Sequence, residues 1–227
     1  GSQTVGSTLR PAAYNGIVGL KPTFGRISLS GVIPLGWTLD TVGILVRSVE
    51  DAALMLQVMA GHDPKDPGSS AQPVPDFLDE MRLAERPPRI GLLSGFFQDH
   101  STSEVWQHTQ EAAQKLAGAG ATVEDVALPA SFASCHSCQR LVMNVECAAF
   151  HQEFFQHRAD EYGPRIRSGI EMGMLVSGVD YLKAQRLRRA FREDMTRMLD
   201  GYDVVLTPAT PAPAPRDLNT TGDAAFQ

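Results

Sequence analysis

Apolar residues recur at three- and four-residue steps after residue 48, which indicates an amphipathic helix. Ser48 is placed to cap its N-terminus, and Asp51 lies in the first turn, where the helix dipole favours negative charge. Gly61 marks the end of the helix. The apolar positions that we expect to form its buried face are Leu54, Met55, Val58 and Met59.

A strand, a helix and a second strand are predicted within residues 89–128. Residues 89–93 form a short apolar strand, glycines at 118 and 120 close the helix, and residues 122–128 supply the second strand. The inner stripe of the helix consists of Val105, Thr109, Ala112, Ala113 and Leu116. This order and these lengths predict the right-handed crossover that joins two parallel strands.

The rest of the chain completes an α/β pattern. Residues 139–158 and 180–199 have helical periodicity, and residues 203–208 predict a strand. The inner face of the second of these helices consists of Ala184, Leu187, Phe191, Met195 and Met198. Residues 1–36 predict structured loops and short strands, and the proline-rich residues 62–87 should run over the surface. We therefore expect a mixed β-sheet covered by α-helices, with residues 1–227 forming part of a single domain.

Composition and charge narrow the classes of protein. Apolar residues make up 43% and charged residues 20% of the 227, as in ordinary globular proteins. The net charge of -6 opposes attraction to phosphate backbones, so we expect no nucleic-acid partner. No apolar run approaches the roughly 20 residues that cross a bilayer, so we expect no membrane partner. The three cysteines argue against a disulfide framework and favour a reducing, cytoplasmic location.

Some reactive side chains have a plain structural interpretation. Cys135, Cys138, Cys147 and His151 have zinc-ligand types, but no second close pair of ligands follows Cys147. We therefore expect no metal here, and no redox pair. Glu146 and His151 are five residues apart and share a helix face poorly, so a buried polar anchor is expected rather than an acid-base pair.

A group of arginines in residues 180–199 also has a simple interpretation. They lie on the polar side of the predicted helix, together with Glu193 and Asp194. The arginines concerned are Arg186, Arg188, Arg189 and Arg192. Because both signs of charge share this side, we expect a solvated helix face rather than a surface for nucleic acid.

The candidate chemistry lies in the first thirteen residues. Ser7 is preceded by small residues, so it can occupy a tight turn that exposes its hydroxyl while neighbouring N–H groups point at one spot. Those N–H groups could stabilise a tetrahedral oxyanion. Composition alone does not distinguish this arrangement from an ordinary structural turn. The segment is Gly1-Ser2-Gln3-Thr4-Val5-Gly6-Ser7-Thr8-Leu9-Arg10-Pro11-Ala12-Ala13.

Together with later segments, this block resembles the amidase-signature family. The family's hallmark is a Gly-Ser-rich block with a serine shortly before an arginine and Pro-Ala, followed by a Gly-Leu-Lys-Pro-Thr stretch. The likeness extends over essentially the whole chain. The matching segments, in the family's order, are Gly19-Leu20-Lys21-Pro22-Thr23, Gly25-Arg26, Leu39-Asp40-Thr41-Val42-Gly43, Ser48-Val49-Glu50-Asp51-Ala52-Ala53, Gly61-His62-Asp63-Pro64, Glu146 with His151, Asp180-Tyr181-Leu182 with Ala184, and Tyr202-Asp203-Val204-Val205-Leu206-Thr207-Pro208.

The resemblance implies the amidase signature fold and a serine acyl-enzyme mechanism without metal or organic cofactor. In that mechanism a serine, a second serine held by a cis peptide and a lysine convert a carboxamide into a carboxylate and ammonia. Ser7 matches the nucleophile. The N–H groups of Thr4, Val5, Gly6 and Ser7 match the oxyanion hole.

The family's lysine and bridging serine both precede this block. The lysines of this chain do not match that position; they include Lys21, Lys65, Lys115 and Lys183. A serine hydroxyl needs a base, and a lysine serves only if burial makes it neutral. We therefore expect a fragment that is truncated at both ends and inactive alone.

Two positions differ from the family's commonest motif. Gln3 stands where an aspartate is usual, and Val5 stands where a glycine is usual. We expect Gln3 to support the site by accepting a hydrogen bond from the guanidinium of Arg10. Val5 keeps its N–H but loses the left-handed conformations open to glycine.

These departures favour a stand-alone amidase with a small-molecule amide substrate. The same two residues argue against the A chain of the glutamyl-tRNA amidotransferases, because that chain resembles the commoner motif, with aspartate and glycine at these positions. Such an amidotransferase component and a catalytically inactive binding protein on the same fold remain the alternatives, and a homodimer remains an open option.

Overall fold

The N-terminal segment folds into two small antiparallel sheets around a short helix. In the computed structural model, which describes residues 1–83, 86–222 and 226, strand β1 (Ser2–Gln3) pairs with β3 (Thr41–Val42). Strand β2 (Val18–Leu20) pairs with β4 (Ile44–Val46). Helix α1 (Leu9–Asn15) connects the two sheets and ends at Gly16, whose φ of 63° favours glycine. This segment confirms the expected loops and short strands, but the sequence pattern had not indicated α1.

Helix α2 (Val49–Met59) begins where the sequence predicts, but it buries a different face. The hydroxyl of Ser48 accepts a hydrogen bond from the N–H of Asp51, as expected of a cap. The small residues Ala52 and Ala53 are buried instead. The predicted buried face is wrong for this chain, because Leu54, Met55 and Val58 are 50%, 42% and 76% exposed. Helix α3 (Phe77–Glu80) packs against α2.

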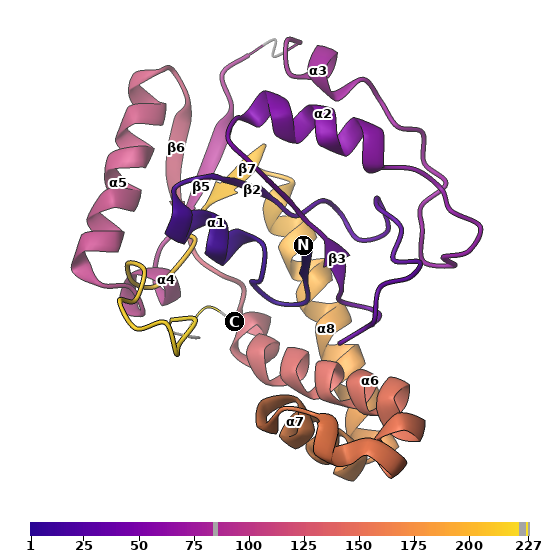
Figure 1. The fold of residues 1–227 in the computed structure, drawn as a ribbon. Helices are drawn as coiled ribbons and strands as arrows, with labels where there is room; N and C mark the ends of the chain where they lie inside the picture. The colour runs from indigo at the N-terminus through magenta and orange to yellow at the C-terminus, as the bar shows by residue number, and fades with distance from the viewer. Residues whose placement is uncertain (84–85, 223–225, 227) are drawn as a thin grey trace.

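A three-stranded parallel sheet forms the second part of the fold (Figure 1). Its central strand β5 (Arg89–Leu93) pairs in parallel with β6 (Thr122–Val126) on one side and β7 (Val204–Leu206) on the other. Helix α4 (Phe96–Asp99) follows β5, and helix α5 (Ser103–Gly118) connects β5 to β6. Leu92, Trp106 and Ala113 form the core between sheet and helix. The predicted strand-helix-strand unit is confirmed, with Trp106 as an additional buried residue.

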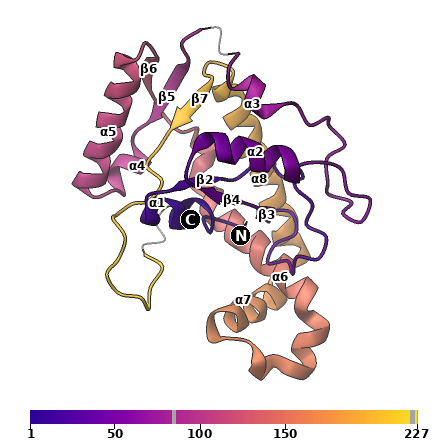
Figure 2. The ribbon, with the colours of Figure 1, turned by 45° about the horizontal axis from the view of Figure 1, so that its top comes forward.

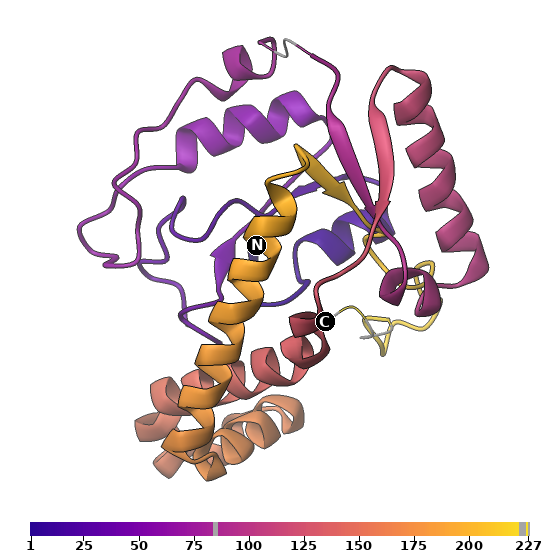
Figure 3. The ribbon, with the colours of Figure 1, turned by 180° about the vertical axis from the view of Figure 1, so that it is seen from behind.

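A layer of long helices forms the third part, remote from α5 (Figure 2). The 3-10 helix η1 (Ala130–Ser134) leads into α6 (Cys135–Arg158), which packs against α7 (Pro164–Leu175) and α8 (Gly178–Leu199). The 3-10 helix η2 (Ala159–Glu161) connects α6 to α7. Seen from behind, α8 runs from the α7 end of this layer toward β7 (Figure 3). The structure thus confirms two predicted helices and adds α7 between them.

Close packing in this layer depends on one glycine. A Cβ atom built on Gly173 of α7 would lie 2.0 Å from the carbonyl oxygen of Asn144 in α6, so only glycine permits this approach. Ile170 of α7 and Val142 of α6 are both fully buried. The fold class is therefore α/β, as the sequence predicts, with antiparallel and parallel strand pairs in separate sheets. Across the described residues, we find no helix that is both long and apolar enough to traverse a bilayer.

Candidate functional site

Ser7 lies in an exposed turn between β1 and α1, where its side chain faces solvent. The carboxamide of Gln3 organises this turn from beneath. Its Oε1 accepts hydrogen bonds from the N–H groups of Thr8 and Leu9 at 2.8 and 3.0 Å, and its Nε2 donates to the carbonyl of Val5 at 2.8 Å. Gln3 is 4% exposed. One buried side chain therefore satisfies three main-chain groups around the serine.

Four successive main-chain N–H groups in this turn have no partner among the described residues. We find no hydrogen bond from the N–H of Thr4, Val5, Gly6 or Ser7 to any residue that the structure describes. Regular pairing resumes on either side, with β1 in its sheet and the Gly6 carbonyl accepting from the N–H of Arg10 at 3.0 Å. Thr4 and its next two neighbours are half-buried, whereas Ser7 is exposed. The turn thus keeps free donors beside an accessible hydroxyl.

The far side of the turn is held by Thr4. Its hydroxyl donates to Oδ1 of Asp40, a carboxylate that precedes β3 and is 4% exposed. The register of the small sheet places Gln3 opposite Thr41, so Thr4 and Asp40 are also neighbours across the end of that sheet. A site residue 36 positions away in the sequence therefore contacts the turn. The Leu39-Asp40-Thr41 match to the family was the available signal, but it gave Asp40 no role.

The hydrogen bond expected between the guanidinium of Arg10 and Gln3 is not formed. The Oε1 of Gln3 is already occupied by the N–H groups of Thr8 and Leu9. The guanidinium Nη2 instead lies 3.4 Å from the hydroxyl of Thr221. Arg10 therefore connects α1 to the C-terminal segment rather than supporting Gln3.

A small pocket of about 160 Å³ lies beside the turn. Residues of the turn and of α1 form one wall, and Phe97 with the segment after β7 forms the other. Its lining residues are Gln3, Val5, Gly6, Leu9, Arg10, Phe97, Thr207, Pro208, Ala209, Pro211 and Phe226. The turn therefore borders a concave surface, although Ser7 is not among the residues that line it.

No lysine is seen to serve as a base for Ser7 within the described residues. Burial lowers the pKa of the Lys21 ammonium, which is the direction a general base requires. However, Nζ of Lys21 donates to the carbonyl of Pro22 at 2.8 Å, and no hydrogen bond joins it to Ser7. Lys183 lies 3.7 Å from Asp180 in an exposed ion pair on α8.

Glu146 and His151 do not form an acid-base pair. Glu146 is 1% exposed and accepts hydrogen bonds from the N–H and hydroxyl of Thr38 at 3.0 and 2.7 Å, and from the Tyr181 hydroxyl at 3.1 Å. Nδ1 of His151 lies 3.0 Å from the hydroxyl of Tyr162. The expectation that Glu146 is a buried polar anchor is confirmed.

The cysteines are dispersed along α6. Cys135 and Cys138 lie in its first turn, and Cys147 is buried three turns further along. Burial raises the pKa of the Cys135 and Cys147 thiols, so both are held in the protonated form at neutral pH. Nowhere in the described part of the chain do three His, Cys, Asp or Glu side chains gather in a way that could hold a metal ion.

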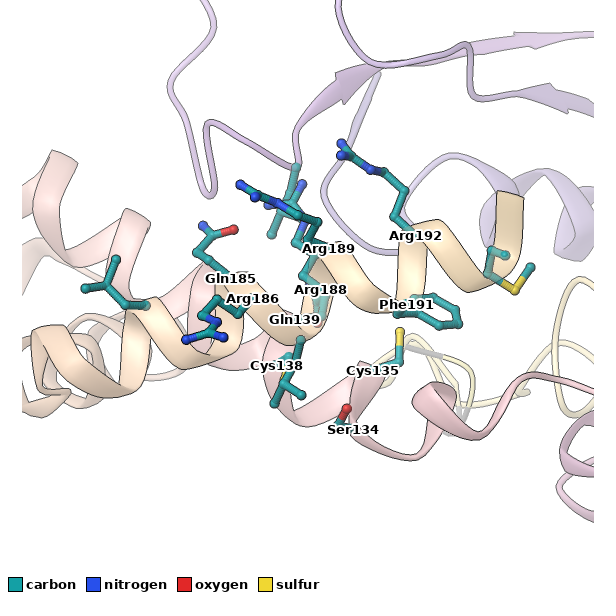
Figure 4. A pocket seen from close by; sticks show the side chains of 14 residues that line it. Ser134, Cys135, Cys138, Gln139, Gln185, Arg186, Arg188, Arg189, Phe191 and Arg192 are labelled. Carbon is teal, nitrogen blue, oxygen red and sulfur yellow. The ribbon is translucent and has the colours of Figure 1, made fainter. Parts of the chain in front are cut away.

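A larger groove of about 740 Å³ lies between α6 and α8. In Figure 4, Arg189 and Arg192 extend from one side of α8 while Cys135 and Cys138 of α6 lie on the other. Arg186, Arg189 and Arg192 are exposed, as expected for a solvated helix face. Arg188 instead turns inward and donates to the hydroxyl and carbonyl of Thr38, both at 2.7 Å. Since no residue of the Ser7 turn lines this groove, we place the candidate site at the smaller pocket.

Comparison with known proteins gives a consistent result. The amidase family profile matches residues 1–225. An amidase from Pseudomonas putida is 36% identical over 217 residues, which are 95% of this chain and 46% of that protein. The A component of a glutamyl-tRNA(Gln) amidotransferase from Levilactobacillus brevis is 35% identical over 240 residues, covering 94% of this chain and 49% of that protein. The chain thus spans about half the length of the relatives that it matches.

Solved structures share the fold over nearly the whole chain. One, described as a vestigial protein complex that reveals the origins of an s-triazine catabolic enzyme, superposes with a TM-score of 0.87 at 32% identity. The superposed residues make up 97% of this chain and 47% of the chain in that structure. A crystal structure of an amidase superposes with a TM-score of 0.81 at 28% identity, covering 97% of this chain and 46% of its own.

Proposed function

Because this chain belongs to the amidase family, we propose that it supplies the nucleophile and the oxyanion hole of a carboxamide hydrolase. Ser7 is the attacking residue. The observation that carries the proposal is the exposed hydroxyl of Ser7 next to four main-chain N–H groups that no described residue uses. The parent protein would convert a small-molecule amide to a carboxylate and ammonia, with no metal or organic cofactor.

The chemistry follows from what the turn offers. Attack of the Ser7 Oγ on an amide carbon gives a tetrahedral intermediate whose oxygen carries negative charge. N–H groups of Thr4, Val5, Gly6 and Ser7 are free to donate to that oxygen. Collapse of the intermediate breaks the C–N bond, and the base that took the Ser7 proton returns it to the leaving nitrogen, which departs as ammonia. Water then hydrolyses the acyl ester left on Ser7. Each main-chain donor in such a site is worth roughly 10²–10³ in rate.

The base is proposed to come from residues other than the lysines of this chain. A hydroxyl is a poor nucleophile at neutral pH and needs a partner that accepts its proton. Lys21 is engaged with the Pro22 carbonyl, which supports its exclusion. The family pattern of a lysine and a bridging serine therefore remains the proposed source, and the chain alone is proposed to be inactive.

The comparisons also support one alternative function, that of an amidotransferase component. The amidotransferase relative from Levilactobacillus brevis matches almost as well as the amidase does, at 35% against 36% identity. In both cases an acyl-enzyme on Ser7 is the proposed intermediate. Release of ammonia from a simple amide in the absence of any partner protein or tRNA would favour the amidase, and release that requires them would favour the amidotransferase.

The test is covalent labelling of Ser7 in the full-length protein that contains this chain. A fluorophosphonate probe reacts with a serine whose hydroxyl is activated beside an oxyanion hole. We expect stoichiometric labelling at Ser7, found by peptide mass spectrometry, together with ammonia release from small carboxamides.

Two variants make the result specific. Ser7→Ala should lose both labelling and turnover, whereas Ser2→Ala, which removes another exposed serine of the same segment, should keep both. Absence of labelling in the full-length protein, or labelling that persists in Ser7→Ala, would overturn the proposal and favour a binding protein. Serine-dependent turnover by the isolated chain would overturn only the proposed inactivity of the fragment.

A further inference from the structure

Two buried carboxylates outside the proposed chemistry contact one short segment, residues 35–40. Asp40 is 4% exposed and Glu146 is 1% exposed. Neither forms an ion pair with any residue in the described ranges. A buried carboxylate without a cation is costly unless hydrogen bonds satisfy it. The hydrogen-bond donors of each carboxylate therefore indicate which part of the chain that carboxylate holds in place.

Asp40 closes the segment into a tight turn and reaches out of it. Its Oδ2 accepts from the N–H groups of Leu35 and Gly36 at 2.8 and 3.1 Å. The N–H groups of Leu39 and Asp40 both donate to the Gly36 carbonyl at 2.8 Å. The remaining oxygen, Oδ1, accepts from the hydroxyl of Thr4. We call residues 35–40 the brace, because Asp40 links it to the first residue of the Ser7 turn.

The other side of the brace is fixed to the helical layer. Thr38 donates to Glu146 of α6 through both its N–H and its hydroxyl, at 3.0 and 2.7 Å. Arg188 of α8 donates to the hydroxyl and carbonyl of the same threonine. The brace is therefore tied to two long helices at Thr38 and to the Ser7 turn at Asp40.

We propose that Asp40 is a positioning residue, which through Thr4 fixes the main-chain donors of the Ser7 turn relative to the α6–α8 layer. The inference rests on the proposed function of that turn. The four N–H groups of the turn have no bond of their own among the described residues; Gln3 fixes the end nearest α1 and the carbonyl of Val5, but it makes no bond to Thr4. The Thr4–Asp40 hydrogen bond fixes the opposite end. Oxyanion donors act only when held to a fraction of an ångström, so loss of this bond lowers the rate of the chemical step.

The first experiment measures the turn itself and needs no activity. Amide hydrogen exchange is recorded for Thr8 and Leu9, whose N–H groups are bonded to Gln3. In the full-length protein that contains this chain, Thr4→Val should speed their exchange about tenfold, because Gln3, which holds both amides, adjoins Thr4 and the turn then opens more often. Thr4→Ser keeps the hydroxyl and should restore protection. Thr41→Val, which removes a neighbouring buried hydroxyl with only a 3.4 Å bond to Leu39, should leave it unchanged.

The second experiment measures catalysis in the full-length protein. Thr4→Val should lower kcat by about tenfold to a hundredfold with KM within about twofold, and Thr4→Ser should recover most of the loss. Asp40→Asn keeps an acceptor for the brace but removes the charge that Thr4 bonds to. The double variant Asp40→Asn/Thr4→Val should be no slower than Thr4→Val alone, because both remove one interaction.

The outcomes separate the two proposals. Unchanged exchange of Thr8 and Leu9 in Thr4→Val, or exchange that rises equally in α5, overturns the positioning role whatever the activity. A change in KM without a change in kcat, or additive losses in the double variant, also overturns it. If exchange responds locally but no turnover depends on Ser7, the turn is positioned as inferred and the proposed function is what fails.

Discussion

The side chain of Thr8 lies directly against the backbone of Gly43, and a Cβ atom built on that glycine would come 2.1 Å from the threonine hydroxyl oxygen and 2.5 Å from its methyl carbon. Thr8 follows the candidate nucleophile and is 1% exposed. Gly43 lies between β3 and β4, and its N–H donates to the Gly1 carbonyl at 2.7 Å. The space available at Gly43 therefore sets how closely the Ser7 turn approaches the two small sheets.

Gly43→Ala should destabilise the fold by about 1–3 kcal/mol, because an added methyl group has no room beside Thr8. Urea unfolding followed by circular dichroism measures the change. Gly118→Ala is the matched control, since a Cβ there meets nothing within 4 Å. It should stabilise α5 by about 0.5–1 kcal/mol, so equal effects of the two variants would contradict the assigned contact.

Thr8→Val should be neutral or stabilising, although Thr8 occupies the N-cap position of α1. An N-cap threonine normally contributes about 0.5–2 kcal/mol, but here its side chain makes no capping hydrogen bond. Its Oγ1 is buried and has no partner among the described residues. Valine has the same shape and removes an unsatisfied hydroxyl. A loss of more than about 1 kcal/mol in the urea midpoint analysis would show that the hydroxyl is bonded.

Gln3→Met should cost about 1–3 kcal/mol of stability. The methionine fills similar space but leaves the N–H groups of Thr8 and Leu9 and the carbonyl of Val5 without partners. The same substitution at Gln110, an exposed residue of α5, should change stability by less than about 0.5 kcal/mol. Thermal and urea unfolding of both variants test the difference. If the Gln3 variant is as stable as the Gln110 variant, the carboxamide does not organise the turn.

Glu146→Gln should destabilise by about 1–3 kcal/mol, because an amide nitrogen then faces donors that a carboxylate satisfied. Tyr181→Phe removes the hydrogen bond to Glu146 at 3.1 Å and the one that the hydroxyl accepts from Gln185 at 2.9 Å, on a partly exposed side chain, and should cost about 0.5–1.5 kcal/mol. Glu193→Gln, on the exposed side of α8, serves as the control and should be neutral within about 0.5 kcal/mol. The order of the three urea midpoints is the measurement, and a Tyr181 variant less stable than the Glu146 variant would reverse the assigned roles.

Stability should fall with acidification partly through His136. Burial among Phe96 and Phe132, and then the charges of Arg140 and His100, lower the pKa of His136 below its ordinary value of 6.5. The unfolded chain therefore binds the proton first, so this contribution to stability is present above about pH 6.5 and is lost as the pH falls through the window below it. His136→Phe should flatten the urea midpoint between about pH 7.5 and 5. Parallel pH profiles for the two proteins would exclude His136 as the cause.

Local sequence signals predicted much of the fold. The Ser48 cap, the β5–α5–β6 unit and the helices α6 and α8 were all predicted from periodicity and glycine positions, and the structure confirms them. Helix α1 was not predicted, because it is only seven residues long and lies in a segment rich in glycine, serine and proline. Helix α7 was also missed, although Pro164 at its first turn is a typical start signal.

Periodicity identified α2 as a helix but not the side that packs. Leu54, Met55 and Val58 form an apolar stripe, yet Ala52 and Ala53 are the buried residues of α2, which packs against β2 and β4. A pattern shows that apolar residues share a face, but only the tertiary structure decides which neighbour they meet. Much of the apolar stripe is therefore exposed in this chain.

The sequence predicted the residues of the candidate site that are contiguous in the chain, but not the distant residues that hold them in place. Ser7 and the four neighbouring peptide groups came from a contiguous motif and from the family resemblance. The partner of Gln3 was predicted incorrectly, because the main-chain N–H groups of Thr8 and Leu9 occupy the oxygen that was expected to accept from Arg10. The role of Asp40 depends on a partner 36 positions away, and that of Thr38 on partners 108 and 150 positions away, which no local pattern contains.

The parallel sheet has a practical consequence for handling the isolated chain. In the order β6-β5-β7, strand β7 has β5 as its one neighbour within the described residues, and Val204 on it is 50% exposed. An uncovered strand edge offers a row of vacant peptide groups that can recruit a strand from another molecule. We expect concentrated preparations to aggregate through β7, and a lysine at Val204 to keep them dispersed.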